Sequence, residues 1–236
     1  MDLVMLDIDG TLTQTYEYDL EAFALAIAEV TGRPIQPINL HEFTQSTSSG
    51  VTEEAIQRLT GRSPEAGELK EVERQVLRQF DRMTAAAPGS FRPVPGAQAF
   101  LNRLRTLPGV GTVIATGGWR LEALYKLNAS GLRVDGIPMA TSDDDPDRRQ
   151  IMQIAVRRAA QHHGCPGFER IVSLGDGVWD LRACAELGYG FVGIGSRLQA
   201  LKELGATRLH PDYLQLEAVL ASIDAALQAG KALLPE

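Results

Sequence analysis

The sequence predicts an α/β fold, a doubly wound parallel sheet of the Rossmann-like kind with an inserted helical domain. Four short apolar runs each stop at a glycine-containing turn, and they cover residues 4–8, 113–115, 171–174 and 191–194. Such runs are typical of strands that are buried on both faces. Amphipathic helical patterns lie between the runs, and this alternation predicts a parallel sheet covered by helices on both faces.

The helices of the sheet domain are predicted from apolar residues at helical spacing. One predicted face carries Phe100, Leu101, Leu104 and Leu107, a second carries Leu121, Leu124 and Leu127, and a third carries Ile151, Ile154, Ala155 and Ala159. This spacing repeats once per helical turn, so each set forms one stripe that can pack on the sheet. Residues 138–141 form a weaker strand candidate.

The segment from about Tyr16 to Ala87 interrupts the alternation, because it contains helical stripes and no convincing strand. A polar run of small residues lies within it at 44–50, before a helix expected to begin near Thr52. Residues 88–96 are rich in proline and glycine and are typical of a return linker. We therefore expect a sheet domain formed by residues 1–15 and 89–236, and a helical domain formed by residues 16–88.

Composition narrows the function classes. The chain has 236 residues, of which 44% are hydrophobic and 22% charged, as in globular proteins. Its 23 basic and 30 acidic residues give a net charge of -7, which disfavours nucleic-acid binding. A phosphorylated small molecule would be repelled too unless local cations receive it. We see no signal peptide and no apolar run of membrane-spanning length, so the expected location is the cytoplasm, without a membrane partner.

The first strand ends in two carboxylates, Asp7 and Asp9, followed by Gly10 and Thr11. Side chains two residues apart on an extended chain point the same way, so both carboxylates can face one pocket. Asp7 also lies inside an apolar run, where an unpaired carboxylate is costly. A cation is therefore expected beside the pair.

Two further strands end in polar groups. Thr116 and Gly117 precede a predicted helix, where a hydroxyl and free backbone N–H groups can bind an anion, although Thr116 could equally serve as a helix cap. Asp176 ends another strand, and Asp180 follows four residues later on the same side of a helix start. Ligands bind beyond the carboxyl ends of parallel strands, and clustered carboxylates suit Mg²⁺.

In this order, the motifs resemble those of the haloacid dehalogenase-like hydrolase superfamily. Asp7-Ile8-Asp9-Gly10-Thr11 resembles its first motif, Thr116-Gly117 its second, and Gly175-Asp176 through Asp180 its fourth. The resemblance spans about residues 3–195. It implies that the helical segment is the helical cap domain of this superfamily, inserted between the first and second motifs.

The resemblance implies a Mg²⁺-dependent phosphatase acting on a small phosphorylated metabolite, as a monomer or homodimer. Asp7 would be the nucleophile and Asp9 the general acid and base. The ion would be held by Asp7, the backbone carbonyl of Asp9, and Asp176, with Asp180 as a ligand or a supporting group. Thr116 and Gly117 would hold the transferring phosphoryl group.

The third motif of the superfamily is a cation, and here the sequence departs from the commoner form, because no Lys-Pro pair lies between Thr116 and Asp176. Residues 143–151 resemble the variant with an arginine at a helix start. We predict that Arg148 neutralises the phosphate, with Arg149 as the alternative.

Two other functions stay open. A phosphomutase would share every core residue named above, and a noncatalytic binding protein could use the same fold. A dehalogenase is disfavoured because it has no need of the acid/base at Asp9. Trp119 and Trp179 could line the mouth of the site or pack against the helical domain.

Overall fold

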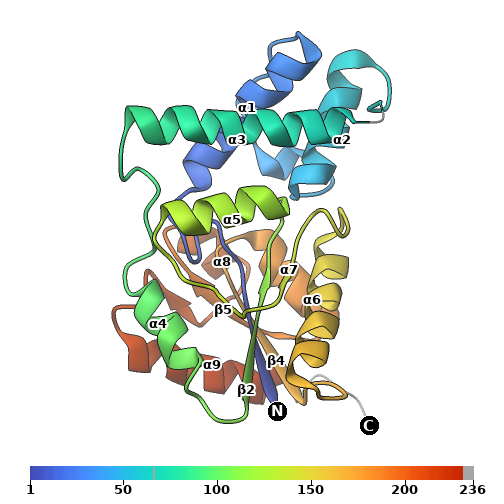
Figure 1. Ribbon diagram of the computed structural model, residues 1–236. Coiled ribbons are helices and arrows are strands. Elements are labelled where there is room, and N and C mark those ends of the chain that lie inside the picture. The colour runs from blue at the N-terminus through green and yellow to red at the C-terminus, as the bar shows by residue number, and fades with distance from the viewer. Residues whose placement is uncertain (66, 231–236) are drawn as a thin grey trace.

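The computed structural model describes residues 1–65 and 67–230, and its centre is a six-stranded parallel sheet (Figure 1). The strands lie in the order β3-β2-β1-β4-β5-β6. Their bounds are β1 Asp2–Leu6, β2 Val110–Ala115, β3 Met139–Ala140, β4 Arg170–Gly175, β5 Gly190–Ile194 and β6 Leu209–His210. The predicted fold class is therefore confirmed, and the sheet gains β6, which the sequence patterns did not indicate.

The strand order runs outward in one direction from β1 to β3 and in the other direction from β4 to β6, so the topological switch point lies between β1 and β4. Leu6, the last residue of β1, is in register with Ile114 of β2 on one side and with Leu174 of β4 on the other. Because all three strands are parallel, their carboxyl ends meet at one edge. A cleft at such a switch point is the usual ligand site of an open α/β sheet.

Helices cover both faces of the sheet because the strands are apolar on both sides. In β1, Val4 and Leu6 belong to one buried cluster, while Leu3 and Met5 belong to the other. Helices α4 (Ala97–Leu104), α5 (Arg120–Ala129) and α9 (Leu216–Gly230) contribute to the first cluster. Helices α6 (Arg148–His163) and α7 (Val178–Leu187) contribute to the second, and α8 (Leu198–Glu203) contacts β5 and β6.

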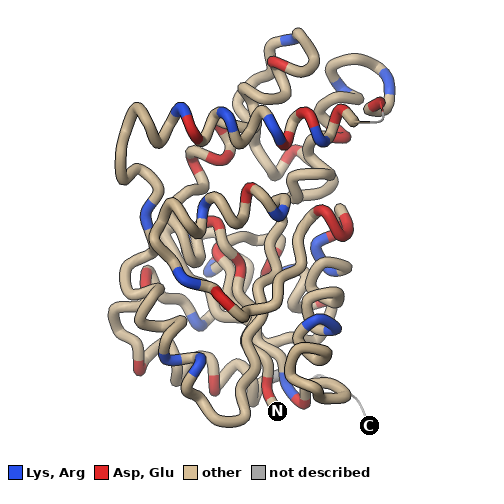
Figure 2. The backbone as a smooth tube through the Cα atoms, viewed as in Figure 1, with Lys and Arg blue, Asp and Glu red and all other residues tan. Residues whose placement is uncertain are grey.

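The helical insert follows β1 and lies beyond the carboxyl edge of the sheet, above α5 in Figure 1. It consists of α1 (Tyr16–Thr31), the short 3₁₀ helix η1 (Leu40–Glu42), α2 (Ser48–Thr60) and α3 (Glu68–Ala86). These helices share a hydrophobic cluster of their own. Figure 2 shows both signs of charge interspersed along the helices of insert and sheet domain. Division of the chain into separate domains at residues 15 and 88 stays a prediction.

The two connections between insert and sheet domain run side by side. The backbone N–H of Gln14 donates to the carbonyl of Arg92 at 2.7 Å, and that of Val94 donates to the carbonyl of Leu12 at 2.8 Å. Thr13 and Pro93 form an antiparallel bridge between these bonds. The insert therefore leaves and rejoins the core at one paired segment, a few residues after Asp9.

Two local predictions were wrong. Helix α2 begins at Ser48, four residues before the predicted start, because the Thr47 hydroxyl caps it by accepting from the N–H of Gly50. On α5, Leu121 and Leu124 are exposed, and the buried face carries Glu122, Ala123, Lys126 and Leu127 instead. The charged pair is buried because it meets partners from other elements, described below. Among the described residues, no helix is both long and apolar enough to cross a membrane.

Candidate active site

Asp7 follows β1 directly and is buried, with 6% of its surface exposed. Its carboxylate accepts a hydrogen bond from the Arg148 Nη2 at 2.8 Å, and its backbone N–H donates to the carbonyl of Leu174. Burial, reinforced by the charges of Asp180 and Asp9 and only partly offset by Arg148, raises the pKa of Asp7 to about 7. The ionised form of Asp7 therefore needs additional positive charge nearby.

Arg148 and Arg149 are neighbours in sequence, but the structure separates them. Arg148 is buried at the first turn of α6, and it donates to Asp180 from Nε at 2.8 Å as well as to Asp7. Its third nitrogen, Nη1, is buried and has no hydrogen-bond partner in the structure. Arg149 pairs with Asp147 and Glu186 on the surface. Arg148 is thus the arginine at the site, although its role there stays a prediction.

Asp7, Asp176 and Asp180 form a cluster in which one carboxylate oxygen of each lies within 4.8 Å of the others. Asp176 is 3% exposed, its Oδ1 has no partner, and its Oδ2 accepts from the Arg197 Nη2 at 2.6 Å. Burial raises the pKa of Asp176 well above its usual range. An orphaned buried oxygen among hard carboxylate ligands fits a Mg²⁺ ion. Asp180 is largely committed to Arg148, which suits a supporting position.

Gly10 is required beside this cluster. Its φ is 77°, and a Cβ there would lie 1.6 Å from the Asp176 Oδ2. A side chain at this position would therefore be strained in its backbone and would displace a candidate metal ligand. The chain can turn away from Asp9 so close to Asp176 only because residue 10 has no side chain.

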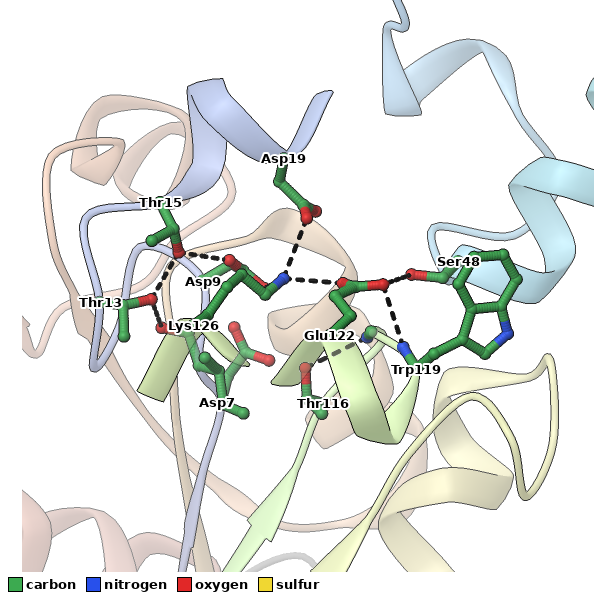
Figure 3. Close-up of polar contacts among 12 residues, drawn as sticks. Asp7, Asp9, Thr13, Thr15, Asp19, Ser48, Thr116, Trp119, Glu122 and Lys126 are labelled. Atoms are coloured by element: carbon green, nitrogen blue, oxygen red, sulfur yellow. Dashed lines mark hydrogen bonds and ion pairs between the residues drawn. The ribbon is translucent and has the colours of Figure 1, made fainter. Parts of the chain in front are cut away.

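The side chain of Asp9 belongs to a different environment. Its Oδ1 accepts from the Thr15 hydroxyl at 2.6 Å, and its Oδ2 accepts from the Lys126 ammonium at 2.5 Å. Figure 3 shows Lys126 reaching toward Asp9, Asp19 and Glu122, away from Asp7. The two carboxylates of the first motif are therefore held by separate partners, although only Ile8 separates them.

Lys126 is completely buried, and its ammonium also contacts Asp19 at 3.0 Å and Glu122 at 2.7 Å. Glu122 in turn accepts from the Ser48 hydroxyl and from the backbone N–H of Trp119. Asp19 and Ser48 belong to the insert, so this network joins Asp9 to the insert. Sequence reasoning missed Lys126, and the available signal was its i,i+4 spacing from Glu122 on a predicted helix.

Thr116 follows β2, is buried, and accepts from the N–H of Gly118 at 3.2 Å. The carbonyl of Gly117 accepts from the backbone N–H of Ser48 at 2.8 Å, and a Cβ on Gly117 would lie 3.2 Å from the Ser46 carbonyl oxygen. The second motif is therefore in direct contact with the loop before α2. Both Thr116 and Gly117 line the cavity between sheet edge and insert.

This cavity has a volume of about 50 Å³ and brings Asp7, Asp9, Thr116 and Gly117 to one surface. Trp179 lines it, whereas Trp119 stacks on Phe23 of the insert with ring centroids 5.4 Å apart. Trp179 therefore lines the site, and Trp119 packs against the insert, so each of the two predicted alternatives applies to one tryptophan.

Arg197 also lines the cavity and was not singled out from the sequence. It follows β5, binds Asp176, and lies with its guanidinium carbon 3.4 Å from the ring centroid of Tyr16. The signal that could have found it is its place just past a fourth strand end, beyond Gly195. A cation at that edge faces the same cleft as the other strand ends.

With this geometry in place, residues 1–188 match the sequence model of the haloacid dehalogenase-like hydrolases. The chain belongs to the haloacid dehalogenase-like hydrolase family. The resemblance read from the three motifs is therefore confirmed, and the protein is placed among hydrolases. Asp7, Thr116 and Asp176 directly follow β1, β2 and β4, which are adjacent in the sheet.

Several solved structures are similar to almost the whole chain. A hydrolase from Pseudomonas syringae is 25% identical, with 93% of this chain and 98% of that chain covered and a TM-score of 0.70. CbbY from Rhodobacter sphaeroides, solved in complex with phosphate, is 21% identical over 94% and 98%, also with a TM-score of 0.70. A HAD hydrolase of family IA, variant 3, from Entamoeba histolytica is 13% identical over 95% and 100%, with a TM-score of 0.67. No curated protein matches the chain.

Proposed function

We propose that this hydrolase is a Mg²⁺-dependent phosphatase that cleaves the phosphomonoester of a small phosphorylated metabolite through an aspartyl-phosphate on Asp7. The observation that carries the proposal is the separation of two carboxylates at the end of β1. Asp7 lies with Arg148 and the acidic cluster, while Asp9 is held by Thr15 and Lys126. This separation supports a nucleophilic role for Asp7 and a proton-transfer role for Asp9.

In the first step, a carboxylate oxygen of Asp7 attacks phosphorus and the bond from phosphorus to the alcohol oxygen breaks. The leaving oxygen takes the proton of the Asp9 carboxylic acid, so that a neutral alcohol departs. Arg148 donates to Asp7 and has its Nη1 free, which supports a role in binding an oxygen of the phosphoryl group.

In the second step, a water molecule attacks the aspartyl-phosphate, and Asp9 takes one of its protons. The bond between phosphorus and the Asp7 oxygen breaks, which restores the Asp7 carboxylate and the protonated Asp9, and inorganic phosphate leaves. Splitting the displacement in this way lowers the barrier of each half.

The remaining residues bind and orient the phosphoryl group. Thr116 and Gly117 line the cavity on the same wall as Asp7, and the Thr116 hydroxyl and the Gly117 N–H can donate to the oxygens of the phosphoryl group. Asp7, the Asp9 carbonyl and Asp176 are the groups proposed to hold Mg²⁺, with Asp180 beside them. When bound, the ion would supply positive charge that offsets the repulsion between the Asp7 carboxylate and the phosphate.

The test is phosphate release from p-nitrophenyl phosphate and from a panel of sugar, nucleotide and small-acid phosphates, with Mg²⁺ and with EDTA. The proposal expects release that requires Mg²⁺ and disappears with EDTA. A folded, metal-loaded protein that releases no phosphate from any panel member would contradict it. Transfer of phosphate between two positions of one substrate, without release, would instead identify a phosphomutase.

A further inference from the structure

The cavity has two chemically different walls. The sheet edge supplies Asp7, Asp9, Thr116 and Gly117, which are the groups proposed to act on the phosphoryl group. The insert faces them with Leu20, Phe23, Ile38, Leu40 and Val51. Since the phosphoryl group must contact Asp7, the alcohol portion of the ester extends toward the insert, and this apolar wall is what it meets.

The insert brings no free positive charge to this wall. Among the described residues that line the cavity, none of those from the insert is a lysine, arginine or histidine. The charged residue that the insert does supply is Asp19, a carboxylate that already accepts from Lys126. A second anionic group on the substrate would therefore meet apolar side chains and a negative charge, both unfavourable to it.

Arg197 is the cation among the described lining residues, and it belongs to the core. Its guanidinium donates to the Asp176 Oδ2 from both Nε and Nη2, at 2.9 and 2.6 Å, and covers the ring of Tyr16. It thus neutralises the acidic cluster beside Asp7. Its charge is already matched by Asp176, and on the insert side it lies over the ring of Tyr16.

Two hydroxyls of the insert at this wall, those of Thr47 and Ser48, are also occupied. The Thr47 hydroxyl donates to the Pro146 carbonyl at 2.7 Å, and the Ser48 hydroxyl donates to Glu122 at 3.1 Å. The Ser48 N–H donates to the carbonyl of Gly117. These bonds fasten the insert to the core and leave Ser46 and Tyr16 as the other insert hydroxyls at the cavity, with no cation beside them from the described part of the insert.

We infer that the substrate is a phosphomonoester whose alcohol portion is small, uncharged and mainly apolar, and that Leu40 and its apolar neighbours select against a second phosphate or a carboxylate. The inference rests on the proposed function, because only the phosphatase activity would make this ligand a substrate. The preference itself is a property of the cavity and can be measured by binding alone.

The decisive experiment compares two nonhydrolysable ligands of equal size by calorimetry in the presence of Mg²⁺. They are 3-methylbutylphosphonate and 2-carboxyethylphosphonate, in which a carboxylate takes the place of the isopropyl group. We expect 3-methylbutylphosphonate, whose tail is uncharged and which is called the uncharged compound below, to bind at least tenfold more tightly. Equal or tighter binding of the carboxylate compound would overturn the inference, as would failure of the uncharged compound to bind.

A matched pair of variants tests the wall itself. Leu40→Lys introduces a cation at a half-buried lining position, and it should shift the ratio of the two dissociation constants at least tenfold toward the carboxylate compound. Leu25→Lys makes the same change on the exposed side of α1, away from the cavity, and should leave the ratio unchanged. A similar shift in both variants, or in neither, would count against the apolar wall as the selecting element.

Turnover separates this inference from the proposed function. Isobutyl phosphate and phosphoglycolate form the corresponding pair of esters, and the uncharged one should have the larger kcat/KM. If neither ester is hydrolysed while the uncharged phosphonate still binds more tightly, the proposed phosphatase activity fails and the preference of the cavity stands. If both are hydrolysed equally well and both phosphonates bind equally, the phosphatase proposal stands and the inference fails.

Discussion

Two clusters of three carboxylates lie within the site, and they are neutralised in different ways. Asp9, Asp19 and Glu122 surround the ammonium of Lys126, which contacts all three. Asp7, Asp176 and Asp180 are approached by Arg148 and Arg197 from the sides, and the Asp176 Oδ1 remains buried without a partner. The first cluster has a protein cation at its centre, and the second has cations only at its margin.

The difference shows how similar acidic clusters can serve different chemistry. Burial alone would lower the pKa of Lys126, but the charges of Asp19, Asp9 and Glu122 outweigh burial and raise it well above its ordinary value, so Lys126 stays charged. That cluster is complete without an ion. Burial raises carboxylate pKa values in both clusters, those of Asp19 and Glu122 in the first and those of Asp7 and Asp176 in the second. The second cluster differs because the Asp176 Oδ1 is buried there without a hydrogen-bond partner. A divalent ion is therefore expected at the second cluster.

The largest expected effect follows from removing the proposed nucleophile of the second cluster, Asp7. Asp7→Asn should lower turnover on the order of 10⁴-fold or more, since the amide cannot form the acyl-phosphate. The side chain keeps its size, so the circular dichroism spectrum should be unchanged. Phosphate release by the folded variant at the wild-type rate would show that the cluster has another role.

The second prediction compares neighbouring arginines at the margin of the same cluster. Arg148→Met should lower kcat/KM by about 10²- to 10³-fold, because it removes a buried donor beside Asp7. Arg149→Met removes only exposed ion pairs and should change kcat/KM by less than about twofold. Steady-state kinetics of the two variants would contradict this assignment if both lost activity to the same degree.

The third prediction concerns the centre of the first cluster. Lys126→Met leaves buried carboxylates without their cation and should lower the free energy of unfolding by about 3–5 kcal/mol, measured by urea denaturation. Lys70→Met is the control, because Lys70 also joins insert to core, through Asp143, but is exposed. Its effect should be within about 1 kcal/mol. Equal losses in the two variants would mean that the Lys126 cluster is not the stabilising one.

A kinetic readout separates stability from the positioning of Asp9 in that variant. Esters with a poor leaving group need the proton of Asp9, whereas p-nitrophenolate leaves without one. The folded Lys126→Met variant should therefore lose much of its activity toward an alkyl phosphate. It should lose less of the initial rate at which p-nitrophenolate is released from p-nitrophenyl phosphate. A uniform loss across leaving groups would indicate a structural role only.

The smallest predicted effect is on thermal stability and depends on pH. Carboxylates whose folded-state pKa is raised stabilise the fold while protonated, and that contribution is lost as pH rises toward the raised value, about 7 for Asp7. Mg²⁺ should offset this loss, so it should raise Tm by several degrees at pH 8 and by less at pH 5.5. Asp176→Asn should abolish the increase. An increase that is larger at pH 5.5 would contradict the assignment of the ion to this cluster.

The sequence was informative where local pattern and chemistry coincide. Asp7, Thr116 and Asp176 each end an apolar run, so both their strands and their meeting at one edge could be predicted. The buried face of α5 was predicted wrongly, because leucine spacing was taken as the packing signal. Lys126 and Glu122 are buried by partners in α1, in α2 and after β1, and no pattern within the helix carries that information.

The main chain passes between insert and core at the paired connections of Thr13 and Pro93, so a hinge between the two would lie there. Asp9 and its partner Thr15 lie next to this segment, so a rotation of the insert would change the distance between them least. Rotation of the insert about this segment would break the Lys70–Asp143 ion pair and the bonds of Thr47 and Ser48 to the core. The hydrogen bond from Thr15 to Asp9 lies beside the paired connections and would not have to break in such a rotation.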